Sequence, residues 1–390
     1  MPCFAGTAQK LLPADTKESE RRVFVCALAL RAGMFLACAA CVALHSGDLS
    51  LQTLLHQLTR WDSPHYVNLV ERGYAGYMEN GQHLFLVFYP LYVWLTRAVC
   101  LLVPNTILAG MAVSWVCFAW GCRYVYRLAA RLFGPAVGKD AVLYLSFFPF
   151  SFFFGTVMTE GLFLLTTAAA CCCALEEKWL PFALWGALAA MTRMTGVLVL
   201  IPAGYVVLRR TEVLKQPDLP HLKALLGKNP LLLAPLLGTG VYLLLNWQVD
   251  GDPFAFVRHQ AHWHQGGMWI GGVLRYVAEN ALGSLDQSIG WAIWLPELLL
   301  FAAFFAVLTA GAVKKLHAGL LAFGFCYLVA NYSLSWLLSA GRYLSCGFML
   351  FILLAALLEK HPHLRRALLG AEAVGLGVYL FAWLSGAQIM

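Results

Sequence analysis

Apolar residues recur along this chain in long runs, which shorter polar segments separate. Of the 390 residues, 61% are hydrophobic and only 12% are charged. A soluble core of this size does not require so apolar a composition, whereas a membrane-spanning helix needs about 20 largely apolar residues. The pattern therefore predicts an all-α polytopic membrane protein in which residues 1–390 form a single membrane domain.

Eleven of the apolar runs have the character of membrane spans. Several are shorter than a bilayer requires, so we expect their helices to be broken or to borrow residues from the neighbouring loops. The predicted spans cover 23–44, 106–126, 140–158, 161–175, 179–192, 196–208, 230–246, 290–312, 318–338, 344–358 and 367–385.

The basic residues predict the side of the membrane that each loop faces. If the N-terminal segment 1–22 is cytoplasmic, 19 of the 27 basic residues, including all ten lysines, fall on the cytoplasmic side. Residues 1–22 have no apolar stretch typical of a cleavable signal, so we expect the first run to be retained as a span. The net charge of +7 then reflects topology, because the basic residues form no patch suited to nucleic acid.

The apolar run 84–103 is predicted to be re-entrant or to lie at the outer surface. If it crossed the membrane, every later loop would change side, and the basic segments near 123–139 and 209–228 would be exported. Without that crossing, the outer side carries two large loops, residues 45–105 and 246–288. Interfacial helices are expected within them.

The 12 cysteines lie almost entirely inside apolar runs, including the triplet Cys171 to Cys173. None shows the paired spacing of metal ligands. We expect them to behave as small buried hydrophobic residues.

The most polar stretch of the first outer loop, residues 60–65, joins two predicted surface helices. Leucines at helical spacing predict an amphipathic helix over 49–59, lying in the membrane interface. Ser63 and Pro64 are typical of a helix start, and Gly73 of a stop. Asp62 lies at the joint, where it is either a catalytic carboxylate or a cap of the second helix.

Other candidates lie where spans reach the outer side. Glu160 interrupts an apolar stretch, and an acid at membrane depth is a functional candidate, although Thr159 and Glu160 also resemble an ordinary helix start. The basic residues that topology does not explain are all arginines: Arg31, Arg60, Arg72, Arg97, Arg193, Arg258, Arg275 and Arg342. Because arginine offers a fork of donors, Arg193 and Arg342 suggest phosphate recognition, the alternative being ion pairs with Glu160 or Asp62.

The second outer loop contains a turn at 251–253 and a short amphipathic helix over 254–260 that leads to Trp263. Its histidines, His259, His262 and His264, either ligate a metal or line a substrate or an interface. The glycines at 266, 267, 271 and 272 predict a mobile loop that closes over a bound molecule.

Several short motifs, in order along nearly the whole chain, resemble the PIG-V family, the GPI mannosyltransferase II type. That family belongs to the GT-C group of membrane glycosyltransferases, which use lipid-phosphate sugars. The matching motifs are Arg60 to Tyr66, Gly73-Tyr74, Phe88 to Tyr92, Phe148 to Phe150, Thr159 to Phe163, Thr192 to Gly196, Gly251 to Phe256 followed by Gln260 and Trp263, and Arg342-Tyr343.

The resemblance implies a GT-C-like fold and an aspartate, Asp62, that activates the acceptor. It also implies a polyprenyl- or dolichyl-phosphate-mannose donor. We therefore expect an inverting hexosyltransferase with Asp62 and Glu160 as catalytic candidates, acting on a lipid-linked or glycan acceptor. The expected substrate- and phosphate-binding residues are Arg60, Trp61, His65, Arg193, Arg258, Gln260, Trp263, Arg342 and Tyr343.

The chain departs from the family in lacking the insertions expected of a eukaryotic member. This favours a bacterial plasma membrane, with the endoplasmic reticulum as the location if the source is eukaryotic, and leaves the acceptor open. The site is expected on the extracytoplasmic or lumenal side. The donor is already activated, so the chemistry requires no cofactor, although it leaves room for a divalent metal.

Two other classes of function fit the composition. A polyprenyl-phosphate or lipid transporter would also place arginines and acids in membrane cavities, but it predicts matched repeats, and no repeat is visible. A non-catalytic membrane subunit would use the outer loops only to bind a partner.

The topology can be tested by labelling cysteines introduced into a cysteine-free variant. A membrane-impermeant reagent added from outside should label cysteines at Asn80 and Gly267 and should miss one at Gln216, because that arrangement keeps every lysine inside. External labelling at position 216 would reverse the assignment of sides.

Overall fold

The computed structural model describes residues 14–48, 50–210, 227 and 229–389, and the fold of these residues is all-α. Between them it contains isolated β-bridges but no strand. The helices up to residue 210 are α1 (Ala14–Ser46), α2 (Leu51–Leu58), α3 (Ser63–Gly76), α4 (Pro90–Val99), α5 (Thr106–Phe133), α6 (Pro135–Phe147), α7 (Glu160–Leu175), α8 (Trp179–Ala190) and α9 (Leu200–Arg210).

The second part of the chain contains both long and very short helices. They are α11 (Pro235–Asp250), α12 (Ala255–His259), α13 (Ile270–Gly283), α14 (Leu295–Val313), α15 (Ala318–Asn331), α16 (Ala340–Ser345), α17 (Phe348–Leu358) and α18 (Pro362–Leu384). Single turns of other helix types are η1 (Leu84–Val87), η2 (Ser151–Gly155), η3 (Met194–Val199), η5 (Pro230–Leu233), η6 (Gln260–Trp263) and η7 (Gly290–Trp294).

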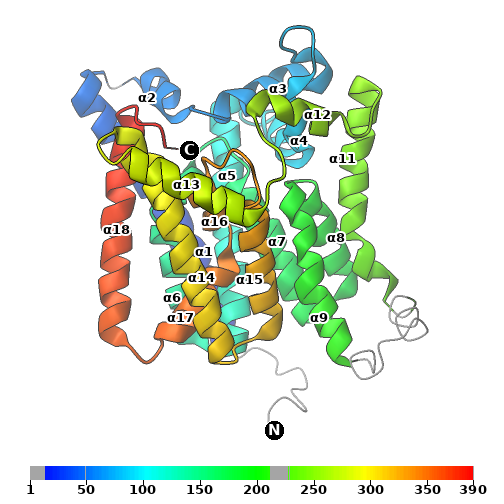
Figure 1. The fold of residues 1–390 in the computed structure, drawn as a ribbon, viewed down its shortest axis with the longest axis vertical. Coiled ribbons are helices and arrows are strands. Elements are labelled where there is room, and N and C mark those ends of the chain that lie inside the picture. Colours follow the sequence, from blue (N-terminus) through cyan, green and yellow to red (C-terminus); the bar gives the residue numbers. More distant parts are fainter. Residues whose placement is uncertain (1–13, 49, 211–226, 228, 390) are drawn as a thin grey trace.

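Each of the eleven predicted spans overlaps a helix of this bundle, which is drawn upright in Figure 1. Among the described residues, five helical segments are long and apolar enough to cross a membrane, and five further apolar helices have only 10–17 residues. At about 1.5 Å per residue, such short helices do not cross a hydrocarbon layer of about 30 Å. The expected breaks are found at η2, at η3 and over residues 332–339, and these breaks bring polar backbone and side chains to membrane depth.

Helix α7 lies at the centre of the bundle. It is apolar on every side, and all its residues from Glu160 to Ala174 are buried against neighbours that include α5 and α8. A helix with no polar face is stable only when other helices surround it. The side chains of Cys171 to Cys173 are buried there without a disulfide, as predicted. Cys26, Cys41 and Cys326 are exposed, which corrects the expectation of burial for these three.

The run 84–103 forms no helix long enough to cross a membrane, which agrees with the prediction that it is re-entrant or lies at the outer surface. It forms η1 and the ten-residue α4, which lie with α3 and α12 at one end of the molecule (Figure 1). Two tyrosines anchor it to the bundle: the Tyr92 hydroxyl donates to Gly110 O at 2.8 Å, and Tyr242 donates to Leu86 O at 2.6 Å. Both large outer loops therefore lie at the same end.

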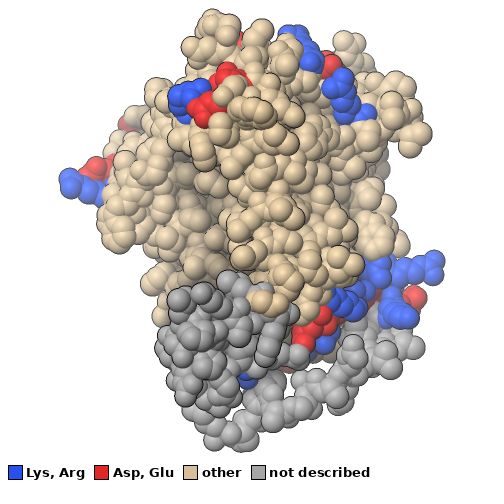
Figure 2. All heavy atoms as spheres, turned by 90° about the vertical axis from the view of Figure 1, so that its right-hand side faces the viewer, with Lys and Arg blue, Asp and Glu red and all other residues tan. Residues whose placement is uncertain are grey.

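Charged residues gather toward the two ends of the molecule, and the surface between them is mostly uncharged in Figure 2. The connections α5–α6, α14–α15 and α17–α18 lie at the end opposite the outer loops (Figure 1). Lys139, Lys314, Lys315 and Lys360 belong to or adjoin these connections. These connections therefore lie at the same end of the molecule, as the predicted order of the spans requires. Which compartment each end faces stays a prediction.

The structure confirms the two surface helices around residue 62 but corrects how the second begins. Helix α2 buries Leu54, Leu55 and Leu58 as expected. Helix α3 already includes Ser63, whose hydroxyl is buried without a hydrogen-bond partner, so Ser63 is not the cap. The helical backbone breaks at Gly73, where φ is 73°, a conformation that favours glycine.

The contact between α7 and α5 depends on a glycine beside Glu160. A Cβ atom added to Gly161 would lie 2.4 Å from the carbonyl oxygen of Ser114 on α5. Because this obstacle is backbone, a side-chain rotation cannot relieve it. Only glycine at this position allows the close approach of α7 to α5. That approach fixes where Glu160 lies along the axis of the bundle.

We therefore expect Gly161→Ala to destabilise the protein by about 1–3 kcal/mol through overpacking. The matched control is Gly377→Ala on α18, where an added Cβ meets nothing within 4 Å. Thermal unfolding of both variants in detergent checks this. Equal melting temperatures for the two variants would contradict the close approach.

Candidate active site

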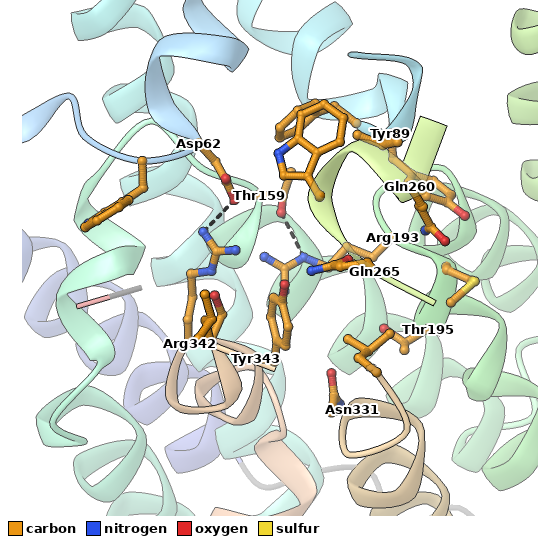
Figure 3. Close-up of a pocket in the computed structure, with 18 of the residues that line it drawn as sticks. Asp62, Tyr89, Thr159, Arg193, Thr195, Gln260, Gln265, Asn331, Arg342 and Tyr343 are labelled. Atoms are coloured by element: carbon orange, nitrogen blue, oxygen red, sulfur yellow. Dashed lines mark hydrogen bonds and ion pairs between the residues drawn. The ribbon is translucent and has the colours of Figure 1, made fainter. Parts of the chain in front are cut away.

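A cavity of about 450 Å³ lies where the two outer loops meet the broken helix ends (Figure 3). Its size falls within the range of roughly 300–1,000 Å³ that is typical of ligand sites. Residues from α3, η3, α15, α16 and the two outer loops contribute to its walls. Among them are Trp61, Asp62, His65, Tyr66, Tyr89, Thr159, Arg193, Gln260, Trp263, Gln265, Asn331, Arg342 and Tyr343.

The Asp62 carboxylate in this cavity is held by an arginine from the far end of the chain. Arg342 Nη1 donates to Asp62 Oδ2 at 2.6 Å. The Asp62 side chain remains 32% exposed, whereas that of Arg342 is only 7% exposed. Asp62 makes no capping hydrogen bond to α3, which rules out the interpretation of this residue as a helix cap. The preceding residue, Trp61, has a left-handed backbone conformation with φ of 56°, which is uncommon for a bulky residue. This conformation sets the direction in which Asp62 leaves the backbone.

Glu160 lies beneath the Asp62–Arg342 pair, and its carboxylate interacts with two arginines. Its carboxylate forms an ion pair with Arg193, and Arg342 Nε is 3.5 Å from Glu160 Oε1. The residue is fully buried and does not line the cavity. This placement corrects the expectation that Glu160 is a second catalytic acid. It positions the arginines instead.

Both guanidinium groups lie near the ring of Tyr343, with their carbon atoms 5.5 Å and 5.2 Å from its centroid. Arg193 Nε also donates to Thr159 Oγ1 at 2.8 Å. Each guanidinium group has five N–H donors, and the contacts with Asp62, Thr159, Glu160 and the Tyr343 side chain use only part of them. N–H donors of both arginines are therefore available to an anion in the cavity.

The formal charges of this network balance without a ligand. Two arginines face two carboxylates, Asp62 and Glu160. Buried charges are costly unless paired, so the partly exposed Asp62 completes the neutralisation of Arg342. If an anion replaced Asp62 at Arg342, the arginines and Glu160 would carry one net positive charge, which suits a monoanion.

His65 lines the cavity as a neutral group. Its Nδ1 lies 3.0 Å from the Tyr77 hydroxyl, and its ring packs near Phe85 and Phe88. Burial lowers the pKa of His65, because desolvation disfavours the charged imidazolium. We therefore expect His65 to be uncharged at neutral pH and to act as a hydrogen-bonding group.

Two arginines expected at the site lie elsewhere. Arg60 donates to the carbonyl of Trp383 near the end of α18 and does not line the cavity. Arg258 is exposed and pairs with Asp250 and Asp252. Both expectations are corrected: each arginine meets a nearby carbonyl or carboxylate, so neither is available to the cavity.

The remaining arginines without a topological explanation also lie outside the cavity. Arg31 is buried and donates to the carbonyls of Ser151 and Ser146 at 2.6 and 3.0 Å, satisfying the broken end of α6. Arg275 pairs with Glu279 on the surface of α13. Arg72 and Arg97 are exposed on the outer loop. Of the eight arginines, only Arg193 and Arg342 line the cavity.

The histidines of the second outer loop do not converge on one point. His259 Nε2 lies 3.3 Å from Asp250 Oδ2, His262 packs on Trp263, and His264 lies near Trp336. Within the described part of the chain, no group of three or more His, Cys, Asp or Glu side chains is arranged to hold a metal ion.

The glycine-containing segment of that loop is docked beside the cavity. Met268 N donates to Ser333 O at 2.8 Å, and Ser335 N donates to Gly266 O at 2.9 Å. Ser335 Oγ also accepts from Gly266 N at 2.8 Å. These bonds tie the loop to the segment between α15 and α16. The loop is thereby held over the site, and its expected mobility stays a prediction.

Eight of the eleven expected site residues line the cavity, and several lining residues were not anticipated. Asn331 is one of them, and a single amide in the apolar run 318–338 was a signal that could have revealed it. Gln265 and Ser339 carried no such signal, because their position depends on the pairing of two distant loops.

Comparison with known proteins places part of this site in a family context. Residues 89–237 match the family model of dolichyl-phosphate-mannose-protein mannosyltransferase. The match covers less than half of the chain, so it shows that this segment is similar to that family of mannosyltransferases, and it does not single out the PIG-V family. It includes Glu160 and Arg193 and excludes Asp62 and Arg342. No curated protein and no solved structure matches the chain.

The structure predicts that Glu160→Gln removes the shared counter-charge of two buried arginines. Breaking a buried ion pair from one side typically costs about 3–5 kcal/mol. The same substitution at Glu279, whose partner Arg275 is exposed, should leave stability close to that of the wild type. Unfolding of the two variants side by side is the measurement. A stable Glu160→Gln protein would mean that Glu160 does not support the arginines.

Proposed function

We propose that this protein is an inverting mannosyltransferase that uses a polyprenyl- or dolichyl-phosphate-mannose donor. The observation that carries the proposal is the Asp62–Arg342–Glu160–Arg193 network at the wall of a cavity. It combines one partly exposed carboxylate with two arginines that have free donors. The family match over residues 89–237 supports the class of donor.

In the proposed reaction, Asp62 acts as general base on an acceptor hydroxyl. The acceptor oxygen forms a bond to the anomeric carbon, and its proton passes to Asp62. The bond between that carbon and the phosphate oxygen breaks, and its electron pair leaves with the lipid phosphate. Negative charge grows on this leaving group, so fixed guanidinium groups beside it stabilise the transition state.

The ion pair seen in the structure provides a way for the donor to prepare the base. A donor phosphate that binds Arg342 takes over the role of Asp62 as its counter-charge. The Asp62 carboxylate is then released toward the acceptor. Glu160 is too deeply buried to move with it, so it keeps both arginines in place during the exchange.

The finer assignments are also part of the proposal. The motifs around Asp62, Trp263 and Arg342 favour a PIG-V-like enzyme with a lipid-linked or glycan acceptor. The distribution of lysines favours a site on the non-cytoplasmic side of a plasma membrane or endoplasmic reticulum membrane. The reaction as written requires no metal or other cofactor.

Replacing Asp62 by Asn tests the base. Asparagine keeps an oxygen that accepts from Arg342 but cannot take a proton, and loss of a positioned base typically reduces the rate about 10²- to 10⁴-fold. Because a negative charge is also removed beside the phosphate, we expect donor binding to be retained or tightened. Turnover with labelled lipid-phosphate-mannose and a membrane extract, together with donor binding, is the measurement.

Ser63→Ala is the matched control in the neighbouring residue. The Ser63 hydroxyl is buried without a partner, so its removal should affect neither folding nor turnover appreciably. Near-normal turnover in Asp62→Asn would refute the proposed base.

A further inference from the structure

The charged network occupies only one side of the cavity. Figure 3 shows the labelled Thr195, Gln260 and Asn331 on the side of Arg193 away from Asp62 and Arg342. Among the described residues that line the cavity, Asp62, Arg193 and Arg342 are the only Asp, Glu, Lys or Arg residues. The other side, which we call the neutral half, is therefore polar without formal charge.

The polar groups of the neutral half are not used to hold the fold together. The side chains of Thr195, Gln260 and Gln265 make no hydrogen bond to any described residue, although each lines the cavity. Asn331 uses one amide N–H, which donates to Tyr327 O at 2.8 Å, and keeps its side-chain oxygen free. Amides and hydroxyls both donate and accept, so this wall offers the two kinds of hydrogen bond side by side.

Aromatic rings also line the cavity. Trp263 is one of them and packs edge-on against Phe88, with ring centroids 6.2 Å apart. Trp336 lines the cavity from the segment between α15 and α16 and is 40% exposed. An apolar surface combined with a few neutral polar groups is complementary to a molecule that has hydroxyls around its rim and C–H groups on its faces.

We propose that the neutral half is a binding subsite for a hexose ring. The inference rests on the proposed function and extends it by assigning Thr195, Gln265 and Asn331 to recognition of sugar hydroxyls. An anionic group would pair with the arginines of the charged network and would find no counter-charge among the uncharged residues of the neutral half. A hexose reaches the site from two sources: the mannose of the donor, or a sugar of the acceptor.

The subsite can be tested without turnover on the full chain purified in detergent. Methyl α-mannoside is the probe for the neutral half, because it has the sugar but no phosphate or lipid. Farnesyl phosphate is the probe for the arginines, because it has the lipid phosphate but no sugar. Saturation-transfer NMR suits the weak binding expected of a monosaccharide, and we expect the mannoside to bind while farnesyl phosphate is present.

Isosteric variants identify the groups involved. Thr195→Val and Gln265→Met each remove neutral hydrogen-bonding groups while keeping size, and each should weaken mannoside binding about tenfold. Binding of farnesyl phosphate should stay within about twofold of the wild type. Gln287→Met is the matched control, because Gln287 is exposed and lies outside the cavity.

Competition with mannosyl farnesyl phosphate separates the two sources of the hexose. Displacement of the mannoside by this donor, but not by farnesyl phosphate, assigns the subsite to the donor sugar. Simultaneous binding of both, with the same dependence on Thr195 and Gln265, assigns it to an acceptor sugar.

Two outcomes would overturn the subsite while leaving the proposed function intact. One is that wild-type protein binds farnesyl phosphate but no mannoside, and the other is that both cavity variants bind the mannoside as tightly as the wild type. Failure of farnesyl phosphate to bind would instead count against the proposed donor site.

Discussion

The buried ion network around Glu160 is the constraint on which the functional end of this protein depends. It joins α7, the start of η3, α16 and the first outer loop through contacts between residues as far apart as Asp62 and Arg342. Charges taken out of water are tolerated only when paired, so these four elements cannot shift independently. The same pairing that stabilises the arrangement holds two guanidinium groups at the wall of the cavity. Structure and chemistry therefore rely on one set of interactions.

Broken helices make this network accessible from the cavity. A continuous helix through residues 140–175 or 318–358 would use its backbone N–H and C=O groups in its own hydrogen bonds. It would also leave no space at membrane depth for a cavity inside the bundle. The turn η2 interrupts the first stretch and the segment 332–339 interrupts the second, while η3 separates α8 from α9. The side chains of Thr159, Arg193 and Asn331 lie beside these interruptions. Irregular backbone at this depth is tolerated where protein covers it or where it lines a cavity. The second outer loop provides part of that cover through its hydrogen bonds to residues 333–335.

The arginines illustrate how residues of one type take different roles according to their surroundings. Arg31 satisfies carbonyl groups at the broken end of α6, and Arg60 attaches the first outer loop to the end of α18. Arg193 and Arg342 also have structural partners but keep donors directed to the cavity. Arg193 and Arg342 differ from the other two because their guanidinium groups are buried beside the shared carboxylate of Glu160 and have one face open to the cavity.

The sequence by itself determined the helical class, the approximate positions of the apolar helices, the lack of a membrane-length helix in the run 84–103 and the joint at Asp62. These features follow from local hydrophobic periodicity, charge distribution and helix-breaking residues, which act over a few neighbouring positions. Tertiary structure alone decided that Asp62 pairs with Arg342, that Glu160 lies beneath the cavity, and that Arg60 and Arg258 lie outside it. It also brought Gln265 and Asn331 to one wall. Such pairings join residues that are far apart in the chain, and local pattern carries no information about which distant partner completes a buried charge.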